Sequence, residues 1–164
     1  MAERSGPPTP SEGWSPSPTD PGTGPLLVSA CLVGVACTYD GTAETSAAVV
    51  ALGRGRRLVP VCPEAAGGLP TPRARAEVQA DGRVLTEEGD DVTDAYRRGA
   101  AHAVGLARAT GAEGAVLKAR SPACGCHEVD DGTFRRRRVP GVGVAAGALL
   151  AAGIPVCSEE DVGA

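Results

Sequence analysis

The residues best equipped for chemistry lie in one short segment, Arg120 to Cys126. This segment supplies two thiols, a hydroxyl and a glycine, and it directly follows the apolar run from Gly114 to Lys118. A short apolar run that stops at Ser121-Pro122 is typical of a buried strand that ends in a tight loop. We therefore expect the functional site of the protein in this loop.

Two further strand-like runs end in the same way. Leu26 to Ala30 leads into Cys31, and Leu58 to Val61 leads into Cys62. The carboxyl ends of the strands in an open parallel sheet share one edge, and ligands bind in the crevice there. If these two runs and the run before Cys124 are neighbouring strands in such a sheet, the thiols of Cys31, Cys62 and Cys124 converge at that edge.

The spacing of the cysteines fits none of the familiar metal motifs: there is no Cys-x-x-Cys pair for zinc and no ferredoxin-type run. Buried structural thiols are therefore one interpretation of each cysteine, including Cys37, Cys126 and Cys157. Three converging thiolates could instead hold a 4Fe-4S cluster and leave one iron without a protein ligand, which turns a cluster into a Lewis acid. Glu64 could then act as general base, and Ser121 could orient a substrate by hydrogen bonding.

The elements that must position these residues alternate between strands and helices. The pattern predicts strands at 26–30, 58–61, 114–118 and 154–157, helices at 43–52 and 142–152, and a hairpin of 76–79 with 84–86. It also predicts a long helix that ends at Thr110 and is capped by Asp91 or Thr93. Such alternation indicates parallel βαβ units with right-handed crossovers. The predicted fold class is α/β: a single domain with a central, mainly parallel sheet flanked by helices, with Rossmann-like layering and a small β-hairpin appendage.

Length and composition agree with this single domain. A chain of 164 residues suits one core, and the scarcity of aromatic residues requires a core of Ala, Val, Leu and Ile. A net charge of −4 disfavours a general affinity for nucleic acid. Residues 1–24 are rich in Pro, Ser, Thr and Gly, so we expect a disordered tail in which Trp14 is incidental, followed by the domain over residues 25–164.

The amino-terminal segment lacks the apolar centre of a signal peptide, so we expect the thiols in the reducing cytoplasm. The uncharged stretch from Val139 to Cys157 reaches the length of a membrane span, but its Gly, Ala and Pro content favours a buried helix and strand. Lys118, the only Lys, is a secondary site candidate. His102 is expected at the surface, and a solvated loop is favoured over a phosphate-binding patch for Arg135 to Arg138.

A series of motifs, in order and without large gaps between residues 26 and 161, is shared with a known family. These motifs are Ser29–Gly34, Tyr39–Gly41, Val59–Glu64, Gly67–Arg73, Gly89–Thr93, Leu117–Gly125, Asp131–Phe134 and Gly153–Glu160. On these stretches the sequence resembles the iron-sulfur-dependent thiouracil desulfidases, a family long catalogued as a bacterial domain of unknown function.

The resemblance implies a cytoplasmic enzyme that removes sulfur from thiouracil-type thiocarbonyl compounds, as base or nucleoside, and yields the oxo base and sulfide. It implies that Cys31, Cys62 and Cys124 hold a 4Fe-4S cluster whose remaining iron binds the substrate sulfur. By motif position, it also implies that Glu64 and Ser121 are the catalytic residues.

Some residues depart from the family pattern: Thr38 stands where an Arg is usual, and Cys126-His127 and Arg135 to Arg138 are peculiar to this chain. Two alternatives from other classes stay open. One is a zinc-binding or thiol-redox protein that uses the same cysteines. The other is an RNA-binding module that uses Arg120 and the arginine run, which the lack of aromatic stacking partners disfavours. The sequence leaves the number of subunits open.

Overall fold

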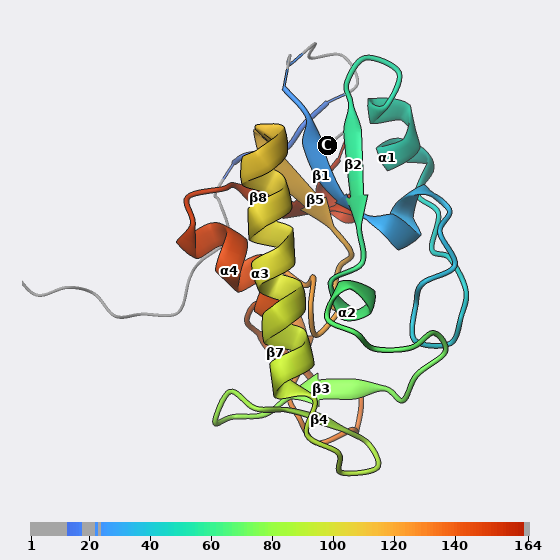
Figure 1. The fold of residues 1–164 in the computed structure, drawn as a ribbon, viewed down its shortest axis with the longest axis vertical. Coiled ribbons are helices and arrows are strands. Elements are labelled where there is room, and N and C mark those ends of the chain that lie inside the picture. Colours follow the sequence, from blue (N-terminus) through green and yellow to red (C-terminus); the bar gives the residue numbers. More distant parts are fainter. Residues whose placement is uncertain (1–12, 18–21, 23, 163–164) are drawn as a thin grey trace, which may run out of the picture.

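A four-stranded parallel sheet forms the centre of the protein, whose computed structural model describes residues 13–17, 22 and 24–162. Its strands are β1 (Leu26–Ser29), β2 (Leu58–Val61), β5 (Gly114–Leu117) and β8 (Val156–Ser158), in the order β2-β1-β5-β8 (Figure 1). The chain places β2 on one side of β1 and later places β5 on the other side. The loops after β1 and β5 therefore diverge and leave a crevice at the carboxyl edge.

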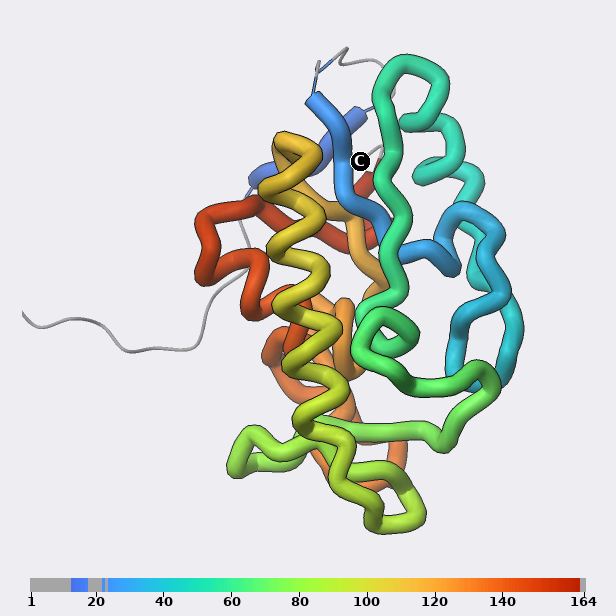
Figure 2. The backbone as a smooth tube through the Cα atoms, in the orientation of Figure 1, coloured from blue at the N-terminus to red at the C-terminus, as the bar shows by residue number. Residues whose placement is uncertain are grey.

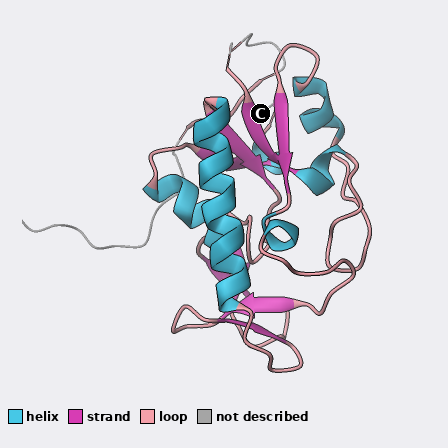
Figure 3. Ribbon diagram, in the orientation of Figure 1, coloured by secondary structure: helices cyan, strands magenta, loops and turns pink. Residues whose placement is uncertain are grey.

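Helices cover both faces of this sheet (Figure 3). α3 (Thr93–Thr110) and α4 (Val144–Ala151) pack on one face, and α1 (Ala47–Leu52) packs on the other. Side chains alternate along each strand, so Leu27 contacts the core beneath α3 and α4 whereas Leu26 contacts the core beneath α1. The predicted α/β class with Rossmann-like layering is confirmed.

Local capping sets the helix bounds. α3 ends where Gly111 adopts the left-handed conformation with φ 70°, at the predicted position. α1 begins at Ala47 rather than at the predicted Ala43, because the Ser46 hydroxyl accepts a hydrogen bond from the Val49 N–H and caps the helix there. The predicted first turn of this helix is therefore wrong.

A short helix that was not predicted, α2 (Pro63–Ala66), follows β2 directly. It packs on α3 through two glycines. A Cβ on Gly67 would lie 1.9 Å from the carbonyl oxygen of Ala95 in α3, and a Cβ on Gly99 would lie 1.8 Å from a carbonyl oxygen of α2. The two backbones are in contact, which fixes the position of α2 and of the Glu64 that it carries.

Two hairpins lie beyond the carboxyl edge of the sheet (Figure 1). β3 (Ala76–Val78) and β4 (Val84–Thr86) form the predicted one. β6 (Glu128–Asp130) and β7 (Arg138–Pro140) form a second in a stretch where a solvated loop was expected. That expectation is wrong for Arg138, which is in a strand, although the whole arginine run is exposed to solvent.

The Glu77 carboxylate joins the two hairpins. Its Oε1 accepts hydrogen bonds from the N–H groups of Gly132 at 3.0 Å and Phe134 at 3.1 Å. Its Oε2 accepts one from the Arg75 guanidinium at 2.7 Å. Because Glu77 is buried, these bonds compensate the loss of its hydration and hold the second hairpin against the first.

The amino-terminal segment is described only at residues 13–17, 22 and 24. Trp14 is half-buried and packs on the α1 side of the core, beside Gly114, where a Cβ would lie 2.3 Å from the indole. The expectation that Trp14 is incidental is therefore wrong, whereas most of the predicted tail lies outside the described residues. Within the described part of the chain, no helix is long and apolar enough to cross a membrane.

Candidate functional site

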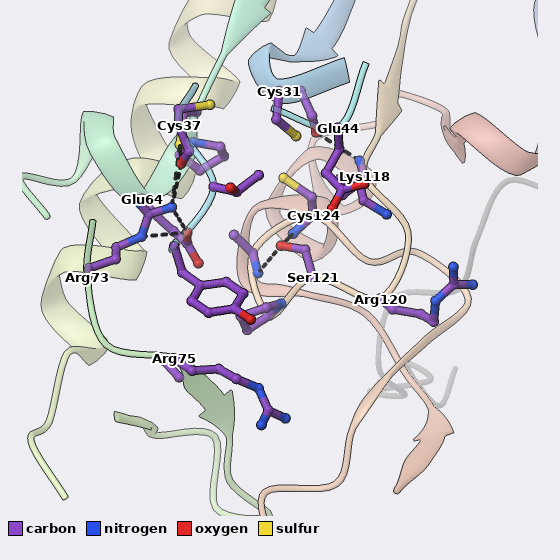
Figure 4. A pocket seen from close by; sticks show the side chains of 18 of the residues that line it. Cys31, Cys37, Glu44, Glu64, Arg73, Arg75, Lys118, Arg120, Ser121 and Cys124 are labelled. Carbon is purple, nitrogen blue, oxygen red and sulfur yellow. Dashed lines mark hydrogen bonds and ion pairs between the residues drawn. The ribbon is translucent and has the colours of Figure 1, made fainter. Parts of the chain in front are cut away.

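The loops after β1, β2 and β5 line a cavity of about 250 Å³ at the carboxyl edge of the sheet. Among the residues that line it are Cys31, Cys37, Cys62 and Cys124. The thiols of Cys31 and Cys124 point toward one another across the cavity (Figure 4). The structure thus brings together the three cysteines that strand-end placement had singled out, and it adds Cys37.

Cys31 reaches the cavity from η1 (Ala30–Val33), the single 3-10 turn that follows β1. Gly34 ends this turn with φ 99°, a conformation that glycine adopts without strain. Burial raises the pKa of the Cys31 thiol to about 11, although the nearby Lys118 ammonium acts in the opposite direction. In the protein alone, the thiol keeps its proton at neutral pH.

Cys124 is held in a tight turn after β5. The Ser121 hydroxyl oxygen accepts hydrogen bonds from the N–H groups of Ala123 and Cys124, both at 3.1 Å. The Ser29 side chain hydrogen-bonds to the Cys124 thiol, and its oxygen also accepts the Lys118 N–H at 2.9 Å. Burial raises the pKa of Cys124 well above its ordinary value, so this thiol also keeps its proton in the absence of a cation.

Cys62 occupies the position before the first turn of α2, and it contacts Cys37. The Cys62 thiol donates a hydrogen bond to the Cys37 carbonyl at 3.6 Å. The loop after η1 lies against the segment after α2 (Figure 2). There the backbone N–H of Arg73 donates a hydrogen bond to the backbone carbonyl of Tyr39 at 2.8 Å. Burial and the neighbouring Cys62 thiol raise the pKa of Cys37 to about 12.

The thiols are close enough together for the charge on one to oppose the ionisation of the next. A thiolate at Cys62 would raise the pKa of Cys31, and thiolates at Cys31 and Cys62 would raise that of Cys124. A bound cationic centre relieves this repulsion, and sulfur ligands are soft donors that favour iron-sulfur clusters, zinc and copper(I). The site is therefore chemically suited to a thiolate-bound metal centre.

Glu64 borders the same cavity, and its carboxylate is fixed from two sides. The Arg73 guanidinium donates to Oε2, through Nε at 2.9 Å and through Nη2. The Tyr96 hydroxyl donates to Oε1. Burial and the Glu64 charge raise the pKa of Tyr96 far above its ordinary value, so the phenol stays protonated and remains a donor.

Arg73 and Tyr96 were not predicted as site residues. Arg73 also donates from Nη2 to the Cys37 carbonyl at 2.8 Å, so one side chain links the carboxylate to the cysteine loop. The position of Arg73 at the end of the motif Gly67–Arg73 could have indicated that it belongs to the site. Tyr96 carries a hydroxyl on the buried stripe of α3 in a chain with few aromatic residues, and a buried hydroxyl needs a polar partner.

The remaining candidates occupy different places. Lys118 and Arg120 line the cavity, where Lys118 pairs with Glu159 at 3.0 Å and Arg120 pairs with Glu160 at 2.5 Å. His102 is exposed on α3, as predicted. Cys126 and Cys157 are buried but are not among the residues that line this cavity.

Comparison with known proteins identifies the family to which the chain belongs. Residues 26–161 match the model of the family described as 2-thiouracil desulfurase. The chain is 36% identical over 146 residues to the uncharacterized protein YbbK of Bacillus subtilis (strain 168), a match that covers 84% of this chain and 97% of YbbK. Among solved structures, it resembles the [4Fe-4S]-dependent thiouracil desulfidase TudS, with a TM-score of 0.77 and 44% identity, covering 84% of this chain and 91% of TudS. The chain belongs to the 2-thiouracil desulfurase family.

Proposed function

We propose that this protein is a [4Fe-4S]-dependent desulfidase that converts a thiouracil-type thiocarbonyl compound and water into the oxo base and hydrogen sulfide. One observation carries the proposal: three strand-end thiols meet in a cavity beside a carboxylate that Arg73 and Tyr96 hold in place. Family membership and the likeness to TudS support the same reaction.

Cys31, Cys62 and Cys124 would hold the cluster. They come from three separate loops at one edge of the sheet, and each thiol borders the cavity. When bound, a cluster with three protein ligands supplies an iron with an open coordination position, which is a Lewis acid for the soft sulfur of a thiocarbonyl group. We assign no cluster ligation to Cys37, whose carbonyl accepts hydrogen bonds from the Cys62 thiol and the Arg73 guanidinium.

Glu64 would take the proton from the attacking water. A carboxylate has about four acceptor positions. Arg73 and Tyr96 occupy positions on both oxygens and fix the direction of the remaining ones, so the base is oriented before a substrate arrives. Glu64 lies in the first turn of α2, directly after Cys62. It is therefore placed beside the proposed cluster site without being one of the proposed cluster ligands.

Ser121 would position the substrate through its hydroxyl hydrogen. The hydroxyl oxygen already accepts two backbone N–H bonds that shape the Cys124 turn. Accepting these bonds polarises the O–H group and makes it a better donor toward a ring nitrogen or carbonyl of a nucleobase. Ser121 would thus combine a structural and a substrate-binding role.

The cavity volume of about 250 Å³ favours a small substrate, namely a free thio-base or its nucleoside. Cysteines that hold a cluster as thiolates need a reducing compartment, which fits a cytoplasmic protein. The exposed arginine run is not among the residues that line the cavity, and the chain has few aromatic residues on which RNA bases could stack, so we do not propose an RNA-binding function.

Anaerobic purification followed by cluster reconstitution tests the proposal. The expected product is a brown protein with about four iron and four sulfide per chain that converts 2-thiouracil to uracil with release of one sulfide per turnover. A colourless protein with stoichiometric zinc after reconstitution would instead support the zinc-binding alternative. A cluster-loaded protein that releases no sulfide from thiouracil or thiouridine would overturn the proposed substrate class while leaving the cofactor assignment intact.

A further inference from the structure

A second group of metal-ligating atoms lies outside the cavity. The Cys126 sulfur, a His127 ring nitrogen and an Asp161 carboxylate oxygen all lie within 4.8 Å of one another. Cys126 and His127 come just before β6, and Asp161 ends η2 (Glu159–Asp161), the 3-10 turn after β8. None of the three residues lines the cavity described above, so this cluster does not belong to the proposed active site.

The distances in this cluster are close to those of a metal site. With a Zn–S bond near 2.3 Å and Zn–N and Zn–O bonds near 2.0–2.1 Å, the ligands of a tetrahedral zinc ion lie roughly 3.3–3.6 Å apart. The Nε2 atom of His127 already lies 2.7 Å from Oδ2 of Asp161, which is hydrogen-bonding distance. An ion that replaced this bond would require side-chain movements of only about 1 Å.

The cluster is held partly in place before any ion binds. Oδ2 of Asp161 accepts hydrogen bonds from the Ser158 N–H at 2.8 Å and the Ser158 hydroxyl at 3.3 Å, as part of the box that caps η2. Cys126 is buried, and its loop is fixed by the adjoining backbone contact of the Gly143 N–H with the Gly125 carbonyl at 2.7 Å. His127 is half-exposed, so the cluster is open to solvent on one side.

The local charge favours a cation. The Asp161 and Glu159 carboxylates both lie close enough to the Cys126 sulfur to act on its charge. The same carboxylates would stabilise a divalent ion there. A thiolate, a neutral imidazole and a carboxylate together neutralise a charge of +2, and this mixed sulfur, nitrogen and oxygen set suits zinc better than magnesium or calcium, which prefer oxygen alone.

We infer that Cys126, His127 and Asp161 bind one zinc-like divalent transition-metal ion, with water at the fourth position. The ion would join the loop that carries Cys124 to the carboxyl-terminal turn, two segments far apart in sequence. Its role would therefore be to stabilise the active-site loop, and it is separate from the proposed desulfuration chemistry.

Zinc binding to the cluster-loaded protein tests this inference. The protein, incubated with zinc chloride and passed through a desalting column, should retain about one zinc per chain with unchanged iron. His127→Ala should lose that zinc, whereas His102→Ala, which removes the other histidine of the chain from the exposed face of α3, should retain it. Cys126→Ser should also lose the zinc and keep the iron.

Thermal unfolding provides a second readout. At free zinc about one hundred times Kd, the midpoint of the wild type and of His102→Ala should rise by about 5–10 °C, and that of His127→Ala should not. No retained zinc in the wild type, or equal zinc in the two histidine variants, would overturn the inference. Because iron content is measured in the same samples, failure of the cluster proposal is distinguishable from failure of this one.

Discussion

Arg73 and Tyr96 fix both carboxylate oxygens of Glu64 in the proposed active site. Glu64→Gln keeps the size of the side chain and removes its basicity. Turnover should fall by roughly 10²–10⁴-fold, as is typical for loss of a general base, with iron content unchanged. Steady-state sulfide release and iron analysis measure the two quantities.

Glu44 provides the control for this variant. Its carboxylate also lines the cavity, but it is exposed and is not bonded to Arg73 or Tyr96. Glu44→Gln should keep near-normal turnover. Near-normal turnover in Glu64→Gln would remove Glu64 from the mechanism, and loss of iron in that variant would show that it supports the cluster loop instead.

The cysteines fall into two groups in the proposal. Replacement of Cys31, Cys62 or Cys124 with Ser should remove most of the iron, because each change removes one of the three proposed cluster ligands. The same change at Cys37, Cys126 or Cys157 should leave iron content near that of the wild type. Absorbance near 400 nm and iron analysis after identical reconstitution compare the six variants. A colourless Cys37→Ser protein would indicate a fourth cysteine ligand and contradict an open iron position.

Helix α2 depends on its glycine contact with α3 for the position of Glu64. A Cβ on Gly99 would lie 1.8 Å from a backbone oxygen of α2, and backbone cannot rotate away as a side chain can. Gly99→Ala should therefore destabilise the protein by about 1–3 kcal/mol and reduce turnover by moving α2. Urea unfolding and sulfide release provide the measurements.

Gly105 on the same helix is the matched control. A Cβ there meets nothing within 4 Å, and the residue is exposed. Gly105→Ala should stabilise α3 by about 0.5–1 kcal/mol and leave turnover unchanged. Equal stability of the Gly99 and Gly105 variants would show that the contact between α2 and α3 is not tight.

The elements that sequence could predict are those with a periodic signal. β2 has its predicted bounds, and α3 ends at the predicted Thr110, because the apolar stripe ends there and the following Gly111 is suited to the left-handed conformation. α2 spans a single turn, too short for a periodic pattern. The second hairpin depends on hydrogen bonds to Glu77, a residue more than fifty positions away, which local sequence does not reveal.

One part of the candidate site was predictable from the sequence, and another part was not. The convergence of three thiols follows from parallel topology, because strand-end residues share an edge whatever the details of the loops. The bonds of Glu64 to Arg73 and Tyr96 do not follow from topology, since they depend on how α2 packs against α3. Topology thus places the proposed cluster ligands, whereas helix packing places the proposed base.

At the scale of the whole molecule, the fold buries thiols that would be ionised more readily in the unfolded chain. Burial raises the pKa of Cys31 to about 11 and that of Cys126 to about 12, and it also raises those of Cys124 and Cys157. An exposed thiol loses its proton near pH 9. Between these values the unfolded chain is ionised at these positions and the folded protein is not.

The stability of the cluster-free protein should therefore fall as the pH rises above about 9. The unfolded state then binds fewer protons than the folded state, so the free energy of unfolding decreases with pH, by up to about 1.4 kcal/mol per pH unit for each such thiol. Below pH 9 both states keep the protons and this contribution is constant. Urea unfolding under anaerobic, reducing conditions at pH 7.5, 9 and 10.5 measures the slope. Cys157→Ala removes one buried thiol, so the free energy of unfolding should fall less steeply above pH 9, by an amount that corresponds to up to one bound proton. An identical slope in both proteins would show that Cys157 does not titrate differently on folding.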